Sequence, residues 1–272
     1  MGDTPIATAS PPEPRVYHGM NWGGLRALYI REVRRLWKIG LQTLLAPLLT
    51  ALLYMLVFVV AVGGSQPKVE GVTYGAFIAP GLIMMQILTS AFTNSSSSLL
   101  QAKINGLIGD LLTPPLSPGE LVAGLTLGAL TRATLIGAVA ELAIWPFARY
   151  GFAHVWAIVY FSLGAGLIMG LLGVMTAIWA EKFDHHAALS NFIVAPITFL
   201  SGTFYLVSRL PEPFRTLARY NPFLYLIAGF RYGFTGRMDG SLTVAVVLTA
   251  VLAAALWAIT WWIVASGYKL KT

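Results

Sequence analysis

The sequence predicts an all-α polytopic membrane protein, with an N-terminal interfacial amphipathic helix followed by six transmembrane helices. Of its 272 residues, 57% are hydrophobic and 11% are charged, and the mean hydropathy is +0.72. An ordinary globular domain carries about 25% charged residues. The few charges are clustered, which leaves several apolar runs of about 20 residues or more, each long enough to cross a hydrocarbon core.

Composition also excludes several classes of site and partner. Because the chain contains no cysteine, disulfides, thiol chemistry and cysteine metal sites are excluded. A formal charge of +7 would favour nucleic acid or acidic partners in a soluble protein. In a membrane protein, basic residues mostly set the orientation in the bilayer. We therefore expect membrane lipids, and no nucleic acid, among the partners.

The N-terminal region divides into two predicted parts. Residues 1–21 are rich in proline and lack apolar periodicity, which predicts a flexible cytoplasmic tail rather than a cleaved signal peptide. Residues 22–38 predict a basic amphipathic helix. Its apolar and basic faces carry, respectively, Trp22, Leu25, Tyr29, Val33 and Leu36, and Arg31, Arg34, Arg35 and Lys38. Such a helix lies on an anionic bilayer surface or docks on a cytosolic partner, and the pattern leaves both open.

Residues 39–272 are predicted to form one six-span transmembrane domain. The apolar runs that predict its spans cover about 41–62, 75–98, 120–145, 154–179, 187–207 and 242–266. Pro47 and Pro196 lie inside the first and fifth spans, where a membrane helix tolerates a kink. Gly166 and Gly170, four residues apart in the fourth span, favour a close approach of two helices.

The longest connection between spans, residues 208–240, predicts short re-entrant or interfacial helices between spans five and six. The apolar residues that indicate them are Phe214, Leu217, Phe223, Leu224, Tyr225 and Ile227. The same connection carries five arginines, at positions 209, 215, 219, 231 and 237. These could attract phosphate or acidic sugar groups, or anchor the connection on lipid headgroups; we favour the anchor.

Six spans place both termini on the same side of the membrane. If that side is cytoplasmic, ten of the lysines and arginines outside the spans face the cytoplasm and seven face outward. Because cytoplasmic loops are enriched in these residues, we predict that both termini are cytoplasmic. Residues 101–118 and 181–186 then face the cytoplasm as well, and residues 208–240 face outward.

The polar loop at residues 101–118 contains a predicted short helix, Asn105–Leu112, which a pair of prolines would end. Its apolar face and its water-facing side would carry, respectively, Leu107, Leu111 and Leu112, and Lys103, Asn105 and Asp110. A short amphipathic helix at a membrane surface must bury its leucines in lipid headgroups or in a partner protein. We favour a partner protein.

No catalytic residue and no metal site is predicted. The phosphate-binding pattern GxxxxGK[ST] is absent, because none of the six lysines follows a glycine. The HExxH pattern and the nucleophile elbow are absent too. Asp184-His185-His186 is the one histidine–carboxylate cluster, but adjacent helical residues point apart, so an interface loop is favoured. The serines of Asn94–Ser98 have no base nearby in sequence, so they do not indicate a catalytic cluster. We expect them to form hydrogen bonds to neighbouring helices.

Arg132 is a charge near the middle of the third span, where insertion costs at least ~2.5 kcal/mol. Such a residue faces a cavity, a partner or the interior of the bundle. Arg132 therefore either lines a path for an anionic or polar headgroup, or has a structural role and bonds to a backbone carbonyl or to a neighbouring helix. The sequence leaves both open. Glu141 follows nine residues later, on the opposite helix face and roughly 13 Å further along the axis. We expect no pair between them and favour a structural role for Glu141.

Together these features resemble the permease subunits of ABC-2 type transporters. Four motifs in the expected order carry the resemblance: APGLIMM at 79–85, LLTPPLS at 111–117, PITFLSGTFY at 196–205 and YNPFLYLIAGFRYG at 220–233. The resemblance covers the chain from Trp22 to the C-terminus. It implies one half of an ATP-driven exporter in a bacterial inner membrane.

The resemblance also implies partners and site residues. A second permease chain, expected to be identical, would pair with this one, and two separate ATPase subunits would carry ATP and magnesium. Residues 103–112 would correspond to the coupling helix, and residues 181–186 to a second, smaller ATPase contact. The implied ATPase-coupling residues are Lys103, Asn105, Leu107, Asp110, Leu111, Lys182 and Asp184. Members of the family export drugs, lipid-linked sugars, polysaccharides and lipo-oligosaccharides, and the motifs do not choose among these.

Two other classes of function remain open on the sequence. A stand-alone channel or secondary transporter would need coupling-ion ligands at mid-membrane, where only Arg132 is clearly placed. An integral-membrane enzyme acting on lipid would need titratable groups at one interface, where only Asp184-His185-His186 is available. A neighbouring reading frame with a GxxxxGK[ST] loop would favour the exporter.

Overall fold

The computed structural model describes residues 19–61, 68–69, 71–207 and 210–270, without the side chains of residues 37–43 and 61. Most of the predicted N-terminal tail lies outside these ranges. The elements are α1 (Trp22–Ala61), β1 (Lys68–Val69), β2 (Val72–Thr73), α2 (Tyr74–Ile104), α3 (Ile108–Leu112), α4 (Pro118–Ala148), α5 (Val155–Trp179), α6 (Phe183–Leu189), η1 (Ser190–Val194), α7 (Ala195–Phe199), α8 (Phe214–Arg219), α9 (Pro222–Thr235) and α10 (Leu242–Ser266).

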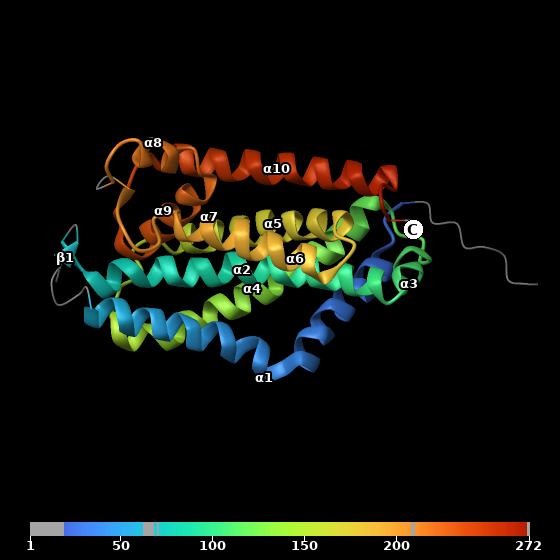
Figure 1. Cartoon of the computed structure of the whole chain (residues 1–272), viewed down its shortest axis with the longest axis horizontal. Coiled ribbons are helices and arrows are strands. Elements are labelled where there is room, and N and C mark those ends of the chain that lie inside the picture. The colour runs from blue at the N-terminus through green and yellow to red at the C-terminus, as the bar shows by residue number, and fades with distance from the viewer. Residues whose placement is uncertain (1–18, 62–67, 70, 208–209, 271–272) are drawn as a thin grey trace, which may run out of the picture.

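The described residues hold four helices that are long and apolar enough to cross a membrane, namely α2, α4, α5 and α10. They run along the long axis of the molecule (Figure 1). A shorter apolar stretch, Leu44–Val60, forms the second half of α1. The chain is therefore a mostly helical, multi-pass membrane protein. The predicted count of six spans stays a prediction.

The predicted amphipathic helix and first span form one continuous helix, α1, of 40 residues, which bends along its length (Figure 1). Its N-terminal half packs on α4. Leu28 lies directly over Gly124, and the Cβ of Glu32 lies 2.5 Å from where a Cβ on Gly128 would be. The buried face is therefore centred on Leu25, Leu28 and Glu32. Trp22, expected on the apolar face, is 69% exposed.

The predicted fifth span differs most from the structure. Residues 183–199 form three short consecutive segments, α6, η1 and α7, of which η1 is a π-helix. The helix ends at Phe199, and Gly202 then takes a left-handed backbone angle with φ of +75°. Between Phe199 and α8, the described residues hold no long helix. Helix α8 lies at the end of the molecule opposite α3 (Figure 1). The helical part of the predicted span 187–207 therefore begins earlier, at Phe183, and ends at Phe199.

The two helices α8 and α9 occupy the predicted long connection, and α9 is mostly buried. Arg231, expected among the exposed arginines of this connection, is 7% exposed. Its Nε donates to the Phe77 carbonyl at 3.1 Å and its Nη2 to the Gly202 carbonyl at 2.7 Å. Arg231 therefore fastens α9 to α2 and to the turn after α7. Arg209 lies outside the described residues.

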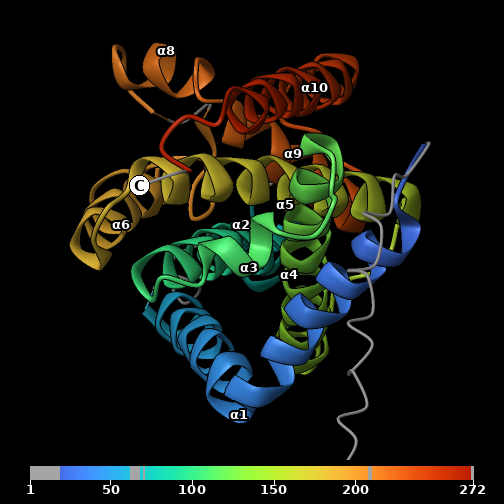
Figure 2. The same ribbon diagram turned by 90° about the vertical axis from the view of Figure 1, so that its right-hand side faces the viewer.

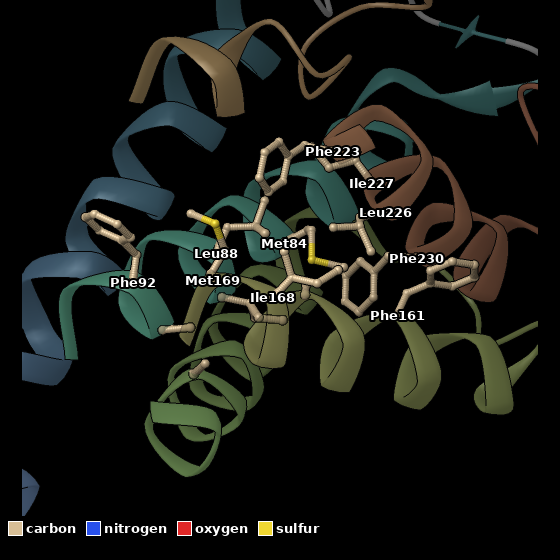
Figure 3. Close-up of a cluster of buried hydrophobic side chains, with 14 of the residues drawn as sticks. Met84, Leu88, Phe92, Phe161, Ile168, Met169, Phe223, Leu226, Ile227 and Phe230 are labelled. Atoms are coloured by element: carbon tan, nitrogen blue, oxygen red, sulfur yellow. The ribbon is translucent and has the colours of Figure 1, made fainter. Parts of the chain in front are cut away.

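Helix α2 is the centre of the bundle, and nearly all of its apolar residues are buried. It packs against α4, α5, α1 and α9. Figure 3 shows side chains of α2, including Met84 and Leu88, meeting residues of α5 and α9 such as Phe161 and Phe230. Because α2 has neighbours on every side, its sequence is apolar all round rather than amphipathic.

Candidate functional site

The end of the bundle that carries α3 gathers the two predicted cytoplasmic loops. The Nζ of Lys103 donates to the carbonyls of Ile178 and Ala180, at 2.9 and 3.1 Å, and so caps the last turn of α5. The Nζ of Lys269 pairs with the Glu181 carboxylate at 2.9 Å. These contacts bring together the ends of α2, α5 and α10 (Figure 1).

The start of α1 lies at the same end. The side-chain amide of Asn21 donates to the Pro115 carbonyl at 3.2 Å, and its backbone N–H donates to Glu120. Glu120 also bonds the Ser117 backbone, and this reciprocal capping box begins α4. The first and last described residues thus lie at the same end of the bundle as residues 101–118 and 181–186.

The short helix of the 101–118 loop begins at Ile108, not at Asn105 as predicted. Asn105 instead closes α2, and its N–H donates to the Gln101 carbonyl at 3.0 Å. Gly106 then takes a φ of +69°, a left-handed angle that glycine adopts at little cost. This turn separates α2 from α3, so the two helices are distinct elements.

The turn also divides the predicted apolar face of α3. Leu111 is 3% exposed and joins the hydrophobic core, with Ile108 and Leu112 packed beside it. Leu107 points away and is 52% exposed. The prediction that Leu107 and Leu111 share one face is therefore wrong. Leu111 anchors α3 on the bundle, and the Leu107 side chain stays half exposed.

Most of the predicted ATPase-coupling residues lie on this open surface. The exposed ones are Asn105, Leu107, Asp110, Lys182 and Asp184. Lys103 is partly buried by its bonds to the end of α5, and Leu111 is buried in the core. Apolar side chains lie among the charged ones: Ile104, Leu107, Trp179 and Phe183 are each 42–52% exposed. We call these four residues, with Asn105, Asp110, Lys182 and Asp184, the α3-end surface.

The two histidines near this surface stack on aromatic rings. The ring centroid of His186 lies 5.7 Å from that of Phe92, and His185 lies 5.4 Å from Trp179. Within the described ranges, no group of three or more His, Asp or Glu side chains lies close enough to hold a metal ion. The histidines help to pack α6 against the ends of α2 and α5.

A second polar site lies between α1, α2 and α4. Arg132 of α4 donates through Nη1 to Asn94 Oδ1 at 3.4 Å. Arg35 of α1 donates through Nη2 to the same oxygen at 3.2 Å, to the Asn94 carbonyl at 2.8 Å and to Ser97 at 3.2 Å. Two guanidinium groups thus meet at one amide side chain of α2. Figure 2 shows α1, α2 and α4 around this part of the bundle.

Glu32 is the acidic member of this site and is 1% exposed. Its Oε1 accepts hydrogen bonds from Ser98 at 2.8 Å and from Arg31 at 2.9 Å. Neither Glu32 nor Arg35 was predicted as a site residue, because helical periodicity placed Arg35 on a basic face toward lipid headgroups or a cytosolic partner and assigned no role to Glu32. The signal that could have found them is the polar run Asn94–Ser98 inside an otherwise apolar helix, since such a run needs polar partners.

The polar run also confirms one expectation. Ser95 donates to the Gly170 carbonyl of α5 at 2.7 Å, and Ser98 donates to Glu32 of α1. These serines bond between helices, as predicted. Arg132 and Glu141 do not pair: Glu141 lines a separate cavity of about 180 Å³ with Thr134 and Ser162.

Comparison with known proteins decides the family. The family model described as ABC-2 type transporter matches residues 24–235. The chain belongs to the ABC-2 type transporter family. It is 31% identical to the inner membrane transport permease YadH of Escherichia coli K12 over 252 residues, 92% of this chain and 98% of YadH. It is 28% identical to nodulation protein J of Rhizobium leguminosarum bv. viciae over 218 residues, 77% of this chain and 80% of that protein.

The ABC-2 match spans both sites. Residues 24–235 include α2 to α9 and all of α1 except its first two residues, and therefore the α3-end surface and the polar site around Arg132. ABC-2 relatives such as YadH are membrane components of transport systems rather than enzymes. The ABC-2 chain described here is accordingly a transmembrane transport protein, related to a permease of the bacterial inner membrane.

Proposed function

We propose that this chain is the permease half of an ATP-driven exporter in the bacterial cytoplasmic membrane. Two such chains, identical in sequence, pair with each other and with two separate ABC ATPase subunits. The ATPases hold ATP and magnesium, and the permease forms the path for a drug, lipid-linked or lipo-oligosaccharide-type substrate. The observation that carries this proposal is the α3-end surface, which leaves apolar side chains uncovered among charged ones in a member of the ABC-2 family.

The chemistry of that surface suits a protein partner. Leu107 and Phe183 are about half exposed, and Asp110, Lys182 and Asp184 lie exposed around them. An apolar centre with a polar rim is the usual arrangement of a protein–protein contact. Both predicted ATPase contacts belong to this one surface, so a single partner subunit can engage them together.

The contacts that attach the α3-end surface to the bundle would transmit a movement of the ATPase to the transmembrane helices. Leu111 fixes α3 in the hydrophobic core, and Lys103 fixes the end of α2 to the end of α5. When ATP closes the ATPase dimer, force on α3 would therefore move α2 and α5 rather than deform a loop. Tilting of the two bundles would open a path at the interface between the permease chains, from which substrate leaves outward.

We also assign Arg132 to the substrate path in this proposal. It carries a positive charge within a membrane helix, remains partly exposed, and has no carboxylate within 4 Å among the described residues. Inserting a charged side chain near the middle of a membrane helix costs several kcal/mol, so such residues are rare and usually have a function. Movement of α2 would reach it directly, because Asn94 of α2 accepts its hydrogen bond.

The structure selects the substitution that tests coupling. Leu107→Asp places a charge on the α3-end surface without touching the core, whereas Leu111→Asp would bury a charge and destabilise the fold. Leu107→Asp should lower transport and transport-coupled ATP hydrolysis by about tenfold, the effect of losing roughly 1.4 kcal/mol of contact energy.

Leu217→Asp is the matched control, because Leu217 is 68% exposed and lies in α8 at the opposite end of the molecule. It should leave both activities within about twofold of the unaltered protein. Transport by the Leu107→Asp variant equal to that of the control, at equal amounts in the membrane, would refute the assignment of the coupling surface.

A further inference from the structure

We call the site formed by Glu32, Arg35, Asn94 and Arg132 the arginine cluster. It carries more positive charge than the surrounding side chains neutralise. Arg35 and Arg132 both donate to Asn94 Oδ1, at 3.2 and 3.4 Å. Two guanidinium groups that share one acceptor repel each other, and burial between helices strengthens the repulsion. A third group of opposite sign between them would relieve it.

Glu32 does not supply that opposite charge in full. Its Oε1 is engaged by Ser98 and by Arg31, which forms an ion pair with it at 2.9 Å. The one carboxylate of the cluster is therefore already paired, with Arg31. Arg35 and Arg132 have no carboxylate within 4 Å among the described residues. Buried charges in proteins are normally paired.

The unused hydrogen-bonding atoms point to the same deficit. The Nε of Arg35, the Nδ2 of Asn94 and the Nε of Arg132 are buried and meet no acceptor within the parts of the chain that the structure describes. Glu32 Oε2 is the one acceptor of the cluster in the same condition. Three N–H donors against one acceptor suit a ligand that is rich in acceptor oxygens.

We propose that the arginine cluster binds an oxyanion of the phosphate class, held between Arg35 and Arg132 with the Asn94 amide as a third donor. Planar guanidinium groups match phosphate oxygens in shape and in charge. Both arginine residues stay partly exposed, which leaves part of the cluster open to a ligand. The oxyanion is the headgroup of a membrane amphiphile or free phosphate.

This inference deepens the proposed function, because Arg132 is the residue placed there on the substrate path. It does not depend on ATP, since the site lies entirely within one permease chain. Binding can therefore be measured in the nucleotide-free transporter. The Leu107→Asp variant tests coupling to the ATPase, and the variants of the cluster test anion binding. Either proposal can therefore be refuted without the other.

The test is calorimetric titration of the complete transporter in phosphatidylcholine nanodiscs, with dihexanoyl phosphatidic acid or inorganic phosphate as the probe. Arg35→Gln and Arg132→Gln should each weaken binding by about tenfold or more. The matched control is Arg34→Gln, which removes an exposed arginine next to Arg35 on the same helix. It should change the affinity by less than about twofold, because general attraction of anions to a basic surface does not need the cluster.

Glu32→Gln supplies a readout of opposite sign. It removes the negative charge from the cluster, and the glutamine oxygen can still accept the bond from Ser98. If the cluster binds an anion, this variant should bind the probe several-fold more tightly. A merely structural cluster would give no such gain. The sign of this change decides the case even if an arginine variant fails to fold.

The two probes identify the source of the oxyanion. Binding of phosphatidic acid alone, abolished in Arg132→Gln, would assign a lipid-type headgroup. Binding of inorganic phosphate with the same dependence on the variants would assign a free oxyanion. Arg35→Gln and Arg132→Gln proteins that bind both probes like the unaltered protein, or a Glu32→Gln protein that binds them more weakly, would overturn the proposal and leave the cluster as a tie between three helices.

Discussion

At the scale of single residues, the ion pair between Glu181 and Lys269 joins the loop after α5 to the end of the chain. Lys269 lowers the pKa of the Glu181 carboxyl below its ordinary value of 4.5, through a hydrogen bond and its charge. A carboxyl with a lowered pKa in the folded state stabilises that state above the ordinary pKa and loses this effect as the pH falls through the lowered value. The pair is therefore formed at neutral pH and lost in acid.

Glu181→Gln should release the C-terminal residues at neutral pH. We expect the protection of the amides at 267–270 against hydrogen exchange to fall in this variant at pH 7. In the unaltered protein the same protection should fall only when the pH drops below the ordinary carboxyl pKa of 4.5, through the lowered pKa of Glu181. Glu212→Gln, which alters an exposed carboxyl at the opposite end, is the control and should leave these amides unchanged. Equal protection in the Glu181→Gln and unaltered proteins at pH 7 would show that the ion pair does not hold this segment.

Single residues of the candidate sites were only partly predictable. Sequence patterns found the exposed Leu107 and the membrane-embedded Arg132, because each stands out from its neighbours in polarity. They could not find the burial of Glu32, Arg35 and Arg231, since, apart from Arg31, the partners of these side chains lie 28 to 154 residues away in the sequence. Helical periodicity describes one helix at a time and carries no record of the neighbours across it.

At the scale of elements, the contact between α2 and α5 depends on glycine. A Cβ added to Gly173 would lie 2.6 Å from the Phe92 carbonyl oxygen and 3.1 Å from the Ser96 nitrogen, both backbone atoms of α2. Real Cβ atoms essentially never approach so closely, so the two helices would have to separate. The predicted small-residue face packs on α4 instead, with Gly166 against Leu130 and Gly170 against Ala129, and a Cβ on Gly170 would make only ordinary contacts.

Gly173→Ala should therefore destabilise the fold by about 1–3 kcal/mol, the usual cost of overpacking. The measurement is the midpoint of thermal unfolding of the purified permease in detergent. Gly109→Ala is the matched control, since a Cβ on Gly109 of α3 meets no atom within 4 Å. It should change the stability by less than about 0.5 kcal/mol. Equal midpoints for the two variants would mean that α2 and α5 do not pack as closely as described.

The positions of the long helices could be predicted well where an apolar run has a clear cap at each end. The sixth predicted span, 242–266, has the same bounds as α10, which Ser241 caps at its start and Gly267 ends in a left-handed angle. Helix α1 was predicted as two pieces because hydropathy changes near residue 39, yet a change of polarity does not interrupt helical backbone bonds. The π-helix within residues 183–199 could not be predicted, because it has no distinctive sequence pattern.

At the scale of the whole molecule, both ends of the described chain and both predicted ATPase contacts lie at one end of the bundle. The short helices α8 and α9 lie toward the other end (Figure 1). This separation agrees with a transporter that receives force on one side of the membrane and releases substrate on the other. The sequence could predict it because charges and span number determine which loops share a side.

The measurement that tests the central claim most directly is site-specific cross-linking from position 107 in native membranes. The chain contains no cysteine, so Leu107→Cys carries a thiol-attached photoreactive group at one place only. We predict an adduct with a separate polypeptide that contains a GxxxxGK[ST] loop, and no such adduct from Leu217→Cys. If position 107 gives no adduct with such a polypeptide, or if both positions give equal adducts, the assignment of the α3-end surface as the ATPase contact would be contradicted.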